Sequence, residues 1–520
     1  MTQQQPFNIV VIGGGTAGWM SAAYLQKRLG RASRSAVTVT VVEAEDIDII
    51  GVGEATIPGF VTMMRELDIP EWKLFAAADA TFKNAIKFVE WGQPPAEGDA
   101  TRRNYFYHPF DPPQVSDHHS AFTHWLALKE AGVAVEPLDV ATSIGAALCE
   151  VNGSPKLFSS PPYEAPIPYA YHLDARKLGQ LLRETAETRG VQRIVGTVTS
   201  ADLEEDGSIG SVVLADGREI EGDLFVDCSG FRGLLIEGAL GAPFESYNDR
   251  LLCDRAVACQ VPFVEGDAAP RAFTTATAQA AGWTWEIDLS SRRGTGYVFS
   301  SKFASDDEAI ATLLRHVNRP DLDLAPRVIP MKVGRRPTPW VKNCVAIGLS
   351  AGFLEPLEST GIHLIELGLR VLVDHLAIGQ QPDPLRQQYN ALMSETYEEI
   401  ADFLMMHYIF NGRRGEPFWD HYRDHVALPP SLVRKLELWA HKVPTVTDLK
   451  ARIRVFEGFS FFAILAGLQT LPPYGANVTP FIDLADSAKA LDAIRSHRQL
   501  AERAVPAHAE MVQKIRATGG

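Results

Sequence analysis

Paired cysteines are missing from this sequence. Its 520 residues include five cysteines, which are widely scattered and contain no Cys-x-x-Cys pair. A disulfide scaffold, a zinc ribbon and a redox-active dithiol are therefore not expected. We expect all five to be buried thiols of a protein in a reducing compartment, at positions Cys149, Cys228, Cys253, Cys259 and Cys344.

A long uninterrupted apolar run is also missing. The most apolar late stretch, Val455–Leu471, is interrupted by Glu457, Ser460 and Gln469. It falls short of the roughly 20 apolar residues that a membrane-spanning helix needs, so we expect a core helix there. Residues 1–8 are polar and lack both a basic region and a small-residue cleavage site, so we expect a cytoplasmic protein that binds no membrane.

Basic residues are fewer than acidic residues. The chain has 49 Lys and Arg against 64 Asp and Glu, a formal charge of -15 at pH 7. Such a surface repels a phosphate backbone, so nucleic acid is not an expected partner. With 46% hydrophobic and 22% charged residues, the composition is that of a globular chain with one large core or two to three domains.

The chain begins with a strand, helix and strand pattern. Phe7–Ile12 has β-branched residues on both faces, which is typical of a central parallel strand. A helical pattern follows over Ala17–Leu29, and a second strand over Ala36–Val42 ends at Glu43. This order is that of a dinucleotide-binding βαβ unit, in which Glu43 would accept a hydrogen bond from an adenosine ribose hydroxyl.

Glycines occupy the turn between the first strand and the helix. Gly13, Gly15 and Gly18 have the spacing G-x-G-x-x-G, which allows a tight turn, a close approach to a pyrophosphate and close packing of helix on strand. Two distant strands, ending near Asp227 and at Gly348, return to the same site and favour an extended FAD over NAD. The FAD contacts that we expect here are Gly13, Gly15, Thr16, Ala17, Gly18, Glu43 and Gly348.

In the rest of the chain, strand patterns are followed by helical patterns. Thr197–Gly222 has the pattern of strands joined by tight turns, and Ala256–Ser301 is rich in strands. From Asp383 onward, helical patterns such as Leu385–Met406 and Ser487–Ile515 dominate. We predict an α/β fold. Residues 1–380 form a Rossmann-like, flavin-monooxygenase-like FAD-binding core with an added β-sheet and interleaved segments of the substrate region, and residues 381–520 form a mainly helical region that completes the substrate pocket.

Six short motifs together resemble the flavin-dependent tryptophan halogenase family. They are GGGTAGW (13–19), GVGEATIP (51–58), TFK (81–83), FYHPF (106–110), GWTWEI (282–287) and FLEPLESTGI (353–362). The resemblance implies an enzyme that receives FADH2 from a separate flavin reductase and uses O2 and halide, chloride or bromide, to form hypohalous acid. It also implies that Leu357 contacts the flavin and that the backbone of Thr360 and Gly361 binds the halide, which agrees with the anion affinity of helix N-termini.

The resemblance makes Lys83 the essential lysine through its place in Thr-Phe-Lys. An ammonium there can polarise hypohalous acid by a hydrogen bond, or its amine can form a haloamine, and both alternatives need the same residue. The alternation over residues 82–89 predicts one strand with Lys83 and Lys87 on the same face. Taken without the family, a lysine in such a strand is a solvated side chain.

Glu358 is the second catalytic candidate, by its match to the family's Glu-Pro-Leu-Glu-Ser-Thr-Gly segment. Electrophilic halogenation forms a cationic ring, which a carboxylate can stabilise and deprotonate. The alternative is an acid that complements the dipole of the helix predicted to begin near Gly361.

The resemblance places Trp283, Trp285 and Ile287 beside the flavin, where they keep the organic substrate away from it. On the residue pattern alone, two tryptophans at i and i+2 are core residues on one strand face. The family has proline after the isoleucine, whereas this chain has Asp288, which puts the local turn in doubt.

The substrate region departs further from the family. Members specific for tryptophan hold its amino-acid group with paired tyrosines, a glutamate and a Phe-Trp pair, yet Asp448–Gly458 has no paired tyrosine, and the chain has no tryptophan beyond Trp439. Burying a carboxylate and an ammonium without partners costs several kcal/mol, so we expect a neutral indole or another electron-rich arene. The alternative is that Arg452 or Arg454 holds the carboxylate of free tryptophan. The substrate contacts that we expect are Phe106, Asn104 in place of a family histidine, and Ser359.

Three other functions stay open. A flavin aromatic monooxygenase would transfer oxygen to the substrate without halide, a non-catalytic relative would bind FAD without turnover, and a tryptophan halogenase proper would prefer the free amino acid. We expect a monomer or a homodimer whose partners are the reductase and a small aromatic substrate.

Overall fold

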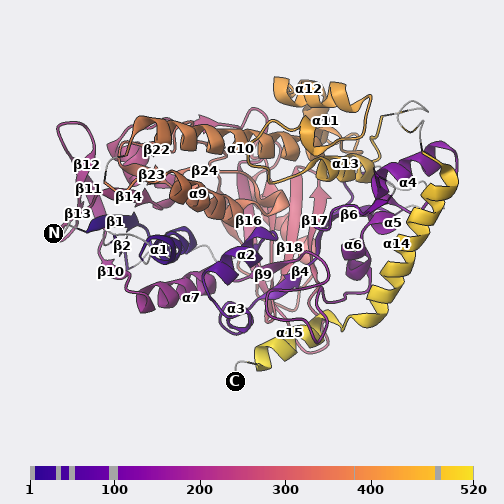
Figure 1. Ribbon diagram of the computed structural model, residues 1–520, viewed down its shortest axis with the longest axis horizontal. Coiled ribbons are helices and arrows are strands. Elements are labelled where there is room, and N and C mark those ends of the chain that lie inside the picture. The colour runs from indigo at the N-terminus through magenta and orange to yellow at the C-terminus, as the bar shows by residue number, and fades with distance from the viewer. Residues whose placement is uncertain are drawn as a thin grey trace. The chain divides into compact units, whose positions relative to one another are not determined.

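The computed structural model describes residues 6–30, 37–45, 53–92, 103–116, 118–379, 381–472, 474, 479 and 482–518. The chain forms two compact units, each assembled from three separate stretches (Figure 1). The first unit comprises residues 1–80, 173–248 and 331–397, and the second comprises 81–172, 249–330 and 398–520. Residues 81–172 and 249–330 thus pack with the C-terminal region.

A six-stranded sheet forms the centre of the first unit. Its order is β10-β2-β1-β14-β23-β22, with five parallel strands and β22 antiparallel at one edge. The strands are β1 (Phe7–Ile12), β2 (Val37–Glu43), β10 (Gln192–Val195), β14 (Leu224–Asp227), β23 (Cys344–Ala346) and β22 (Trp340–Val341). This sheet confirms the predicted Rossmann-like α/β fold, including the return of the two distant strands to β1.

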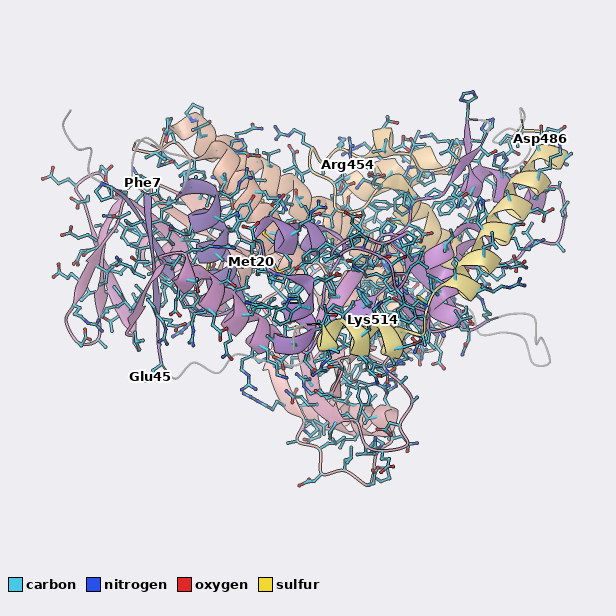
Figure 2. The ribbon with its side chains drawn as sticks, turned by 60° about the horizontal axis from the view of Figure 1, so that its bottom comes forward. Phe7, Met20, Glu45, Arg454, Asp486 and Lys514 are labelled. Atoms are coloured by element: carbon cyan, nitrogen blue, oxygen red, sulfur yellow. The ribbon has the colours of Figure 1, made fainter. Side chains whose placement is uncertain are left out.

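Both faces of this sheet are covered. Val10 and Ile12 pack with Val212 and Leu214 in one apolar core. On the alternate face α1 (Thr16–Leu29) packs on the sheet and on α7 (Ala175–Thr188) and α9 (Gly361–His375). Met20 of α1 is fully buried, which fits a helix packed on one face of the sheet (Figure 2).

Smaller elements complete the first unit. The strands expected over Thr197–Gly222 are confirmed as a three-stranded antiparallel sheet with left-handed glycines at its turns, Gly207 (φ 81°) and Gly217 (φ 86°). Its strands are β11 (Val198–Leu203), β12 (Ile209–Leu214) and β13 (Glu219–Glu221). The remaining elements are β3 (Glu54–Ala55), α2 (Gly59–Glu66), α3 (Glu71–Ala77), β15 (Glu245–Ser246), β21 (Gly334–Arg335) and β24 (Gly352–Phe353), with the short helices η1 (Gly230–Arg232), η2 (Leu234–Ala239), η3 (Gly348–Ser350) and η4 (Pro356–Glu358).

A seven-stranded sheet forms the centre of the second unit. Its order is β20-β16-β19-β18-β17-β5-β6, antiparallel except for the β17–β5 pair. The strands are β5 (Ala85–Val89), β6 (Tyr105–Pro109), β16 (Arg255–Pro262), β17 (Phe273–Gln279), β18 (Gly282–Asp288), β19 (Arg292–Phe299) and β20 (Arg327–Pro330). This is the added β-sheet that the strand-rich segment predicts.

The single strand predicted over residues 82–89 is wrong. The chain forms two strands instead, β4 (Thr81–Lys83) and β5, which pair in different sheets on either side of Asn84. β4 pairs antiparallel with β9 (Ala170–Leu173), with Lys83 opposite Ala170. Lys83 and Lys87 therefore do not share one strand face.

Helices dominate the C-terminal part of the second unit, as predicted. They are α10 (Asp383–Ile409, which begins in the first unit), α11 (Pro417–His425), α12 (Pro430–Trp439), η5 (Val446–Asp448), α13 (Gly458–Gly467), α14 (Leu484–Ala504) and α15 (His508–Ala517). The helix predicted over Ser487–Ile515 is two helices, because Pro506 has no N–H to continue α14. The apolar stretch forms the buried core helix α13, and no helix in the described ranges is long and apolar enough to cross a membrane.

The other elements of the second unit lie outside the large sheet. They are β7 (Val115–Ser116), β8 (His119–Ser120), α4 (Ala121–Glu130), α5 (Leu138–Thr142), α6 (Ile144–Glu150) and α8 (Asp306–Val317). α14 lies along α4, α5 and α6 (Figure 1). All five cysteines are free thiols, of which four are buried as predicted and Cys228 is partly exposed.

Candidate active site

The glycine turn between β1 and α1 is held by close backbone contacts. Gly13 has φ 116°, and a Cβ there would lie 2.4 Å from the Cys228 carbonyl oxygen. A Cβ at Gly18 would lie 1.8 Å from the Gly13 carbonyl oxygen. At Gly15, by contrast, a Cβ would meet no atom within 4 Å in the part of the chain that the structure describes. The fold requires glycine at 13 and 18, and open space for a ligand remains at 15.

Glu43 lies at the end of β2, beside this turn. Its carboxylate accepts a hydrogen bond from Trp19 Nε1 at 3.1 Å and pairs with Arg193. A Cβ at Gly14 would overlap the Glu43 side chain, so the turn and the carboxylate are in direct contact. Each of the two carboxylate oxygens accepts one of these bonds, so lone pairs remain on both for a ribose hydroxyl.

The other predicted FAD contacts of the first unit surround the same turn. Gly348 has φ 75°, and a Cβ there would lie 2.8 Å from the Ala17 Cβ. The Thr16 hydroxyl donates to the Ala175 carbonyl at 3.0 Å, so this side chain joins α1 to α7. Asp227 is fully buried and accepts from the Ser229, Leu235 and Ile236 amides, which makes it an anchor of the loop after β14.

The segment before α9 contains Glu358 in a buried turn. Leu357 and Glu358 are each 1% exposed in η4, and Ser359 follows in the left-handed region at φ 59°. The hydroxyl of Thr360 is buried and forms no hydrogen bond with any described residue. A Cβ at Gly361 would meet no atom of the described residues within 4 Å, so none of them covers the N-terminus of α9 at this point. The first amides of a helix have no partner within it and attract anions.

Strand β18 in the second unit carries the Trp-x-Trp-x-Ile motif on one face. Trp283 and Trp285 are 1% and 6% exposed, with ring centroids 6.3 Å apart. Trp285 lies over Gly296 of β19, where a Cβ would be 2.1 Å from the indole ring. Trp283 Nε1 is buried without a hydrogen-bond acceptor among the described residues, which is unusual for a buried indole.

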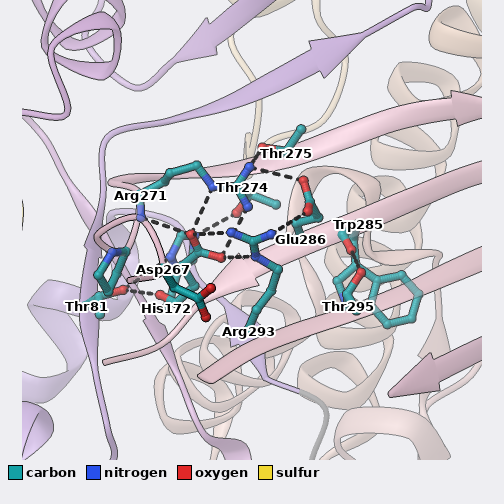
Figure 3. Close-up of polar contacts among 12 residues, drawn as sticks. Thr81, His172, Asp267, Arg271, Thr274, Thr275, Trp285, Glu286, Arg293 and Thr295 are labelled. Carbon is teal, nitrogen blue, oxygen red and sulfur yellow. Dashed lines mark hydrogen bonds and ion pairs between the residues drawn. The ribbon is translucent and has the colours of Figure 1, made fainter. Parts of the chain in front are cut away.

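Asp288, at the position of the family proline, is a buried ion-pair centre. It is the last residue of β18, it is 1% exposed, and its carboxylate pairs with Arg271 at 2.9 Å and Arg293 at 2.6 Å. The same two arginines pair with Glu286 (Figure 3). Burial opposes ionisation of Asp288, but the two guanidinium groups outweigh it and hold the pKa of this carboxyl far below its usual range.

Lys83 is fully buried at the end of β4. Its side chain has zero exposure, and Nζ lies 5.2 Å from the centroid of the Phe110 ring. Nearby His172 is also buried, and burial together with the positive charge of Lys83 lowers the pKa of His172 well below its usual value. A lysine in this position is the opposite of the solvated side chain that the strand pattern alone predicts.

Aromatic side chains surround the predicted substrate residue Phe106. Phe106 is 6% exposed, stacks on Phe88 at 5.1 Å and lies against Gly467 of α13. Asn104, just before β6, is exposed, and its carbonyl accepts from the Glu90 amide at 2.8 Å. The structure therefore brings Phe106 into an aromatic core of the second unit but leaves Asn104 on the surface.

The segment before α13, Asp448–Gly458, contributes one aromatic residue to that core. Phe456 stacks on Phe403 of α10 at 4.0 Å, and His108 lies 6.1 Å from Phe456. Arg452 and Arg454, the alternative carboxylate clamp, are both exposed. Sequence patterns missed Phe403 and Phe456, because apolar residues in a helical region carry no functional signal of their own.

Comparisons with known proteins agree with these motifs. The family model for tryptophan halogenase matches residues 8–483. The chain belongs to the tryptophan halogenase family. It is 35% identical to a tryptophan 6-halogenase of Streptomyces toxytricini, over 98% of both chains, and 36% identical to a tryptophan 7-halogenase of Lentzea aerocolonigenes, over 89% of this chain and 90% of that one.

Solved structures of flavin-dependent halogenases share the fold. A flavin-dependent halogenase from Brevundimonas is 38% identical with a TM-score of 0.87, covering 98% of this chain and 99% of that one. A tryptophan halogenase from Shewanella frigidimarina is 30% identical with a TM-score of 0.91, covering 100% and 99%. The chain is thus a flavin-dependent halogenase that uses FADH2, halide and O2, as the motifs predict. The open space at Gly15 and at Gly361 fits a bound FAD and a halide.

Proposed function

We propose that this halogenase acts on a neutral indole or another electron-rich arene, with Lys83 and Glu358 as its catalytic residues. The observation that carries the proposal is the complete burial of Lys83 beside an aromatic ring. Reduced FAD, supplied by a separate reductase, provides hypohalous acid from O2 and halide when it is bound. All other steps belong to residues of this chain.

Lys83 activates the halogen. Its ammonium donates a hydrogen bond to hypohalous acid and polarises the oxygen–halogen bond, or its amine carries the halogen as a haloamine. A buried position strengthens either interaction, because little water competes with it. The electron-rich ring then attacks the positive end of the polarised bond.

Glu358 accepts the ring proton after attack. A carboxylate stabilises the cationic ring intermediate and restores aromaticity by removing the proton. The amides of Thr360 and Gly361, at the start of α9, hold the halide, and the space around Gly361 supports this role.

The remaining predicted contacts have binding roles. Trp283, Trp285 and Ile287 shield the flavin from the arene, and the free Nε1 of Trp283 is available for a hydrogen bond to a ligand. The FAD contacts in this proposal are Gly13, Gly15, Thr16, Ala17, Gly18, Glu43, Gly348 and Leu357. Phe106 and Ser359 contact the arene. Asn104 is exposed, so the structure does not support it as a substrate contact.

The substrate proposal rests on a missing clamp. Free tryptophan brings an ammonium and a carboxylate, which bind in a buried pocket only with polar partners. Arg452 and Arg454 are exposed, so a carboxylate held there would gain little in water. Relatives named as tryptophan 6- and 7-halogenases make tryptophan the alternative substrate.

Substitution of the catalytic pair tests the proposal. Lys83→Ala should abolish arene halogenation, and Glu358→Gln should lower its rate by about 100-fold, the scale of a lost general base. Products are measured by mass spectrometry in reactions with FAD, a flavin reductase, NADH, O2, bromide and indole. Lys87→Met is the matched control: Lys87 is half-buried among Tyr105, Tyr107 and Phe273, and its loss should leave halogenation unchanged.

Two results would contradict the proposal. Halogenated indole from Lys83→Ala at the wild-type rate would remove Lys83 from the mechanism. Hydroxylated indole formed equally with and without halide would identify a monooxygenase instead.

A further inference from the structure

Strand β4, which carries Lys83, is tied to the end of β18 by one side chain. Thr81 Oγ1 donates a hydrogen bond of 2.6 Å to the carbonyl oxygen of Asp288. The same hydroxyl lies 3.4 Å from Nδ1 of His172, whose Nε2 lies 2.9 Å from the Thr274 hydroxyl (Figure 3). All four residues are at most 5% exposed, so these bonds form away from water.

Three further hydrogen bonds, two of them made by His508, connect β4 and the adjoining Asn84 to residues 270–272. The Phe82 amide donates to Nε2 of His508 at 3.1 Å, and Nδ1 of that ring lies 2.8 Å from the Pro270 carbonyl oxygen. The Asn84 amide donates to the Ala272 carbonyl at 2.7 Å. The residues before and after Lys83 are therefore anchored to the same short segment.

Arg271 lies at the centre of that segment, and Asp288 fixes it. The Asp288 carboxylate accepts hydrogen bonds from the Arg271 amide at 3.0 Å, from its Nε at 2.9 Å and from its Nη2 at 3.2 Å. Arg293 completes the cluster from β19 through its Nε at 2.6 Å. The carboxylate thus holds both the backbone and the side chain of the segment to which β4 is anchored.

We propose that Asp288 is a positioning residue, whose carboxylate sets the place of the Lys83 ammonium relative to the Trp283–Ile287 face. Its carbonyl holds Thr81, and its ion pair with Arg271 holds the anchors of Phe82 and Asn84. This inference rests on the catalytic role proposed for Lys83. It also gives a function to the carboxylate that stands where the family has proline, a residue with no side-chain acceptor.

A positioning role predicts a specific kinetic pattern. Asp288→Asn keeps the size of the side chain but removes its charge. Because small displacements of a reacting group cost one to two orders of magnitude in rate, kcat for indole halogenation should fall about tenfold while KM for indole stays within about twofold. FADH2 consumption should continue, and hypohalous acid that Lys83 no longer directs should escape to a trapping reagent in solution.

Glu286→Gln is the matched control for the ion pairs. Glu286 binds Arg271 and Arg293, as Asp288 does, but it has no hydrogen bond to β4 among the described contacts. Its substitution should leave kcat and the yield of halogenated indole per FADH2 within about twofold of wild type. Equal losses in the two variants would overturn the proposal, because they would show a general effect of ion-pair loss.

Thr81→Val tests the same idea without touching a charge. It removes the bond to the Asp288 carbonyl, and it should lower the yield of halogenated indole per FADH2 about threefold, the scale of one lost hydrogen bond. Wild-type yields in both Asp288→Asn and Thr81→Val would overturn the proposal. Lys83→Ala in the same assay separates the two claims: if it halogenates indole normally, the proposed function fails, whatever the Asp288 variants do.

Discussion

At the scale of single residues, the three glycines of the β1–α1 turn differ in what surrounds them. A Cβ at Gly13 or Gly18 would clash with backbone atoms, whereas one at Gly15 would meet no described residue within 4 Å, and Gly15 has φ -76°, which any residue adopts. The fold therefore does not require glycine at 15, and we infer that a ligand does. This distinction between folding and binding can be measured.

Substitution by alanine should separate these roles. Gly18→Ala forces a Cβ against the Gly13 carbonyl and should destabilise the protein by about 1–3 kcal/mol, as overpacking does. Gly15→Ala should leave the melting temperature of the FAD-free protein unchanged and weaken FAD binding about tenfold. Thermal unfolding and quenching of flavin fluorescence measure the two effects, and wild-type FAD affinity in Gly15→Ala would contradict the assignment.

Lys83 shows what a local pattern cannot predict about a single side chain. Its motif selected it as the catalytic lysine, and that role stays a prediction. The sequence did not predict its burial, because residues that pack on β4 come from far along the chain; His508, for example, bonds to the amide of Phe82, 426 positions away. Arg271 and His508 carry no motif and were missed for the same reason.

At the scale of elements, the break at Asn84 is the clearest departure from prediction. Alternation over residues 82–89 is continuous, so it predicts one strand. The Asn84 amide instead bonds to Ala272, and the Asn84 side chain donates to the Gly153 carbonyl at 3.0 Å. Tertiary hydrogen bonds thus divide the strand, whereas the βαβ unit was predicted well because its signals are local.

The contact between β4 and α15 predicts a pH dependence of stability. Burial lowers the pKa of His508 from 6.5 to about 4. Between these values the unfolded chain binds a proton that the folded chain does not, so stability is complete above pH 6.5 and falls as the pH drops toward 4. The neutral ring agrees with the geometry, in which Nε2 accepts from Phe82 and Nδ1 donates to Pro270.

His508→Gln should remove this dependence. The free energy of unfolding of the wild type should lose about 3 kcal/mol more than that of the variant between pH 6.5 and pH 4. Urea unfolding at several pH values measures the difference. His497→Gln on α14, which replaces an exposed histidine, is the control, and equal pH slopes in the wild type and His508→Gln would refute the expectation.

At the scale of the whole molecule, each unit is assembled from three stretches of chain. Local patterns predicted most strands and helices, but they contain no information on which distant stretches pack together. The first unit carries the predicted FAD contacts and Glu358, and the second carries Lys83 and the tryptophan face.

Substrate choice is also a property of the whole chain. The tyrosines and the tryptophan of the family's clamp are missing from Asp448–Gly458, and the exposed Arg452 and Arg454 are poor replacements. An aromatic core with Phe106, Phe403 and Phe456 occupies the second unit near that segment. We propose that these rings contact the substrate, and aromatic contacts favour a flat, neutral ring over a zwitterion.

A direct competition between indole and free tryptophan tests the central claim most sharply. The wild-type enzyme, supplied with FAD, a flavin reductase, NADH, O2 and bromide, is given equal concentrations of both arenes, and brominated products are quantified by their isotope doublets. We predict at least about tenfold more bromoindole than bromotryptophan, which corresponds to roughly 1.4 kcal/mol of discrimination, and no bromoindole with Lys83→Ala. Predominant bromotryptophan from the wild type would contradict the substrate proposed here.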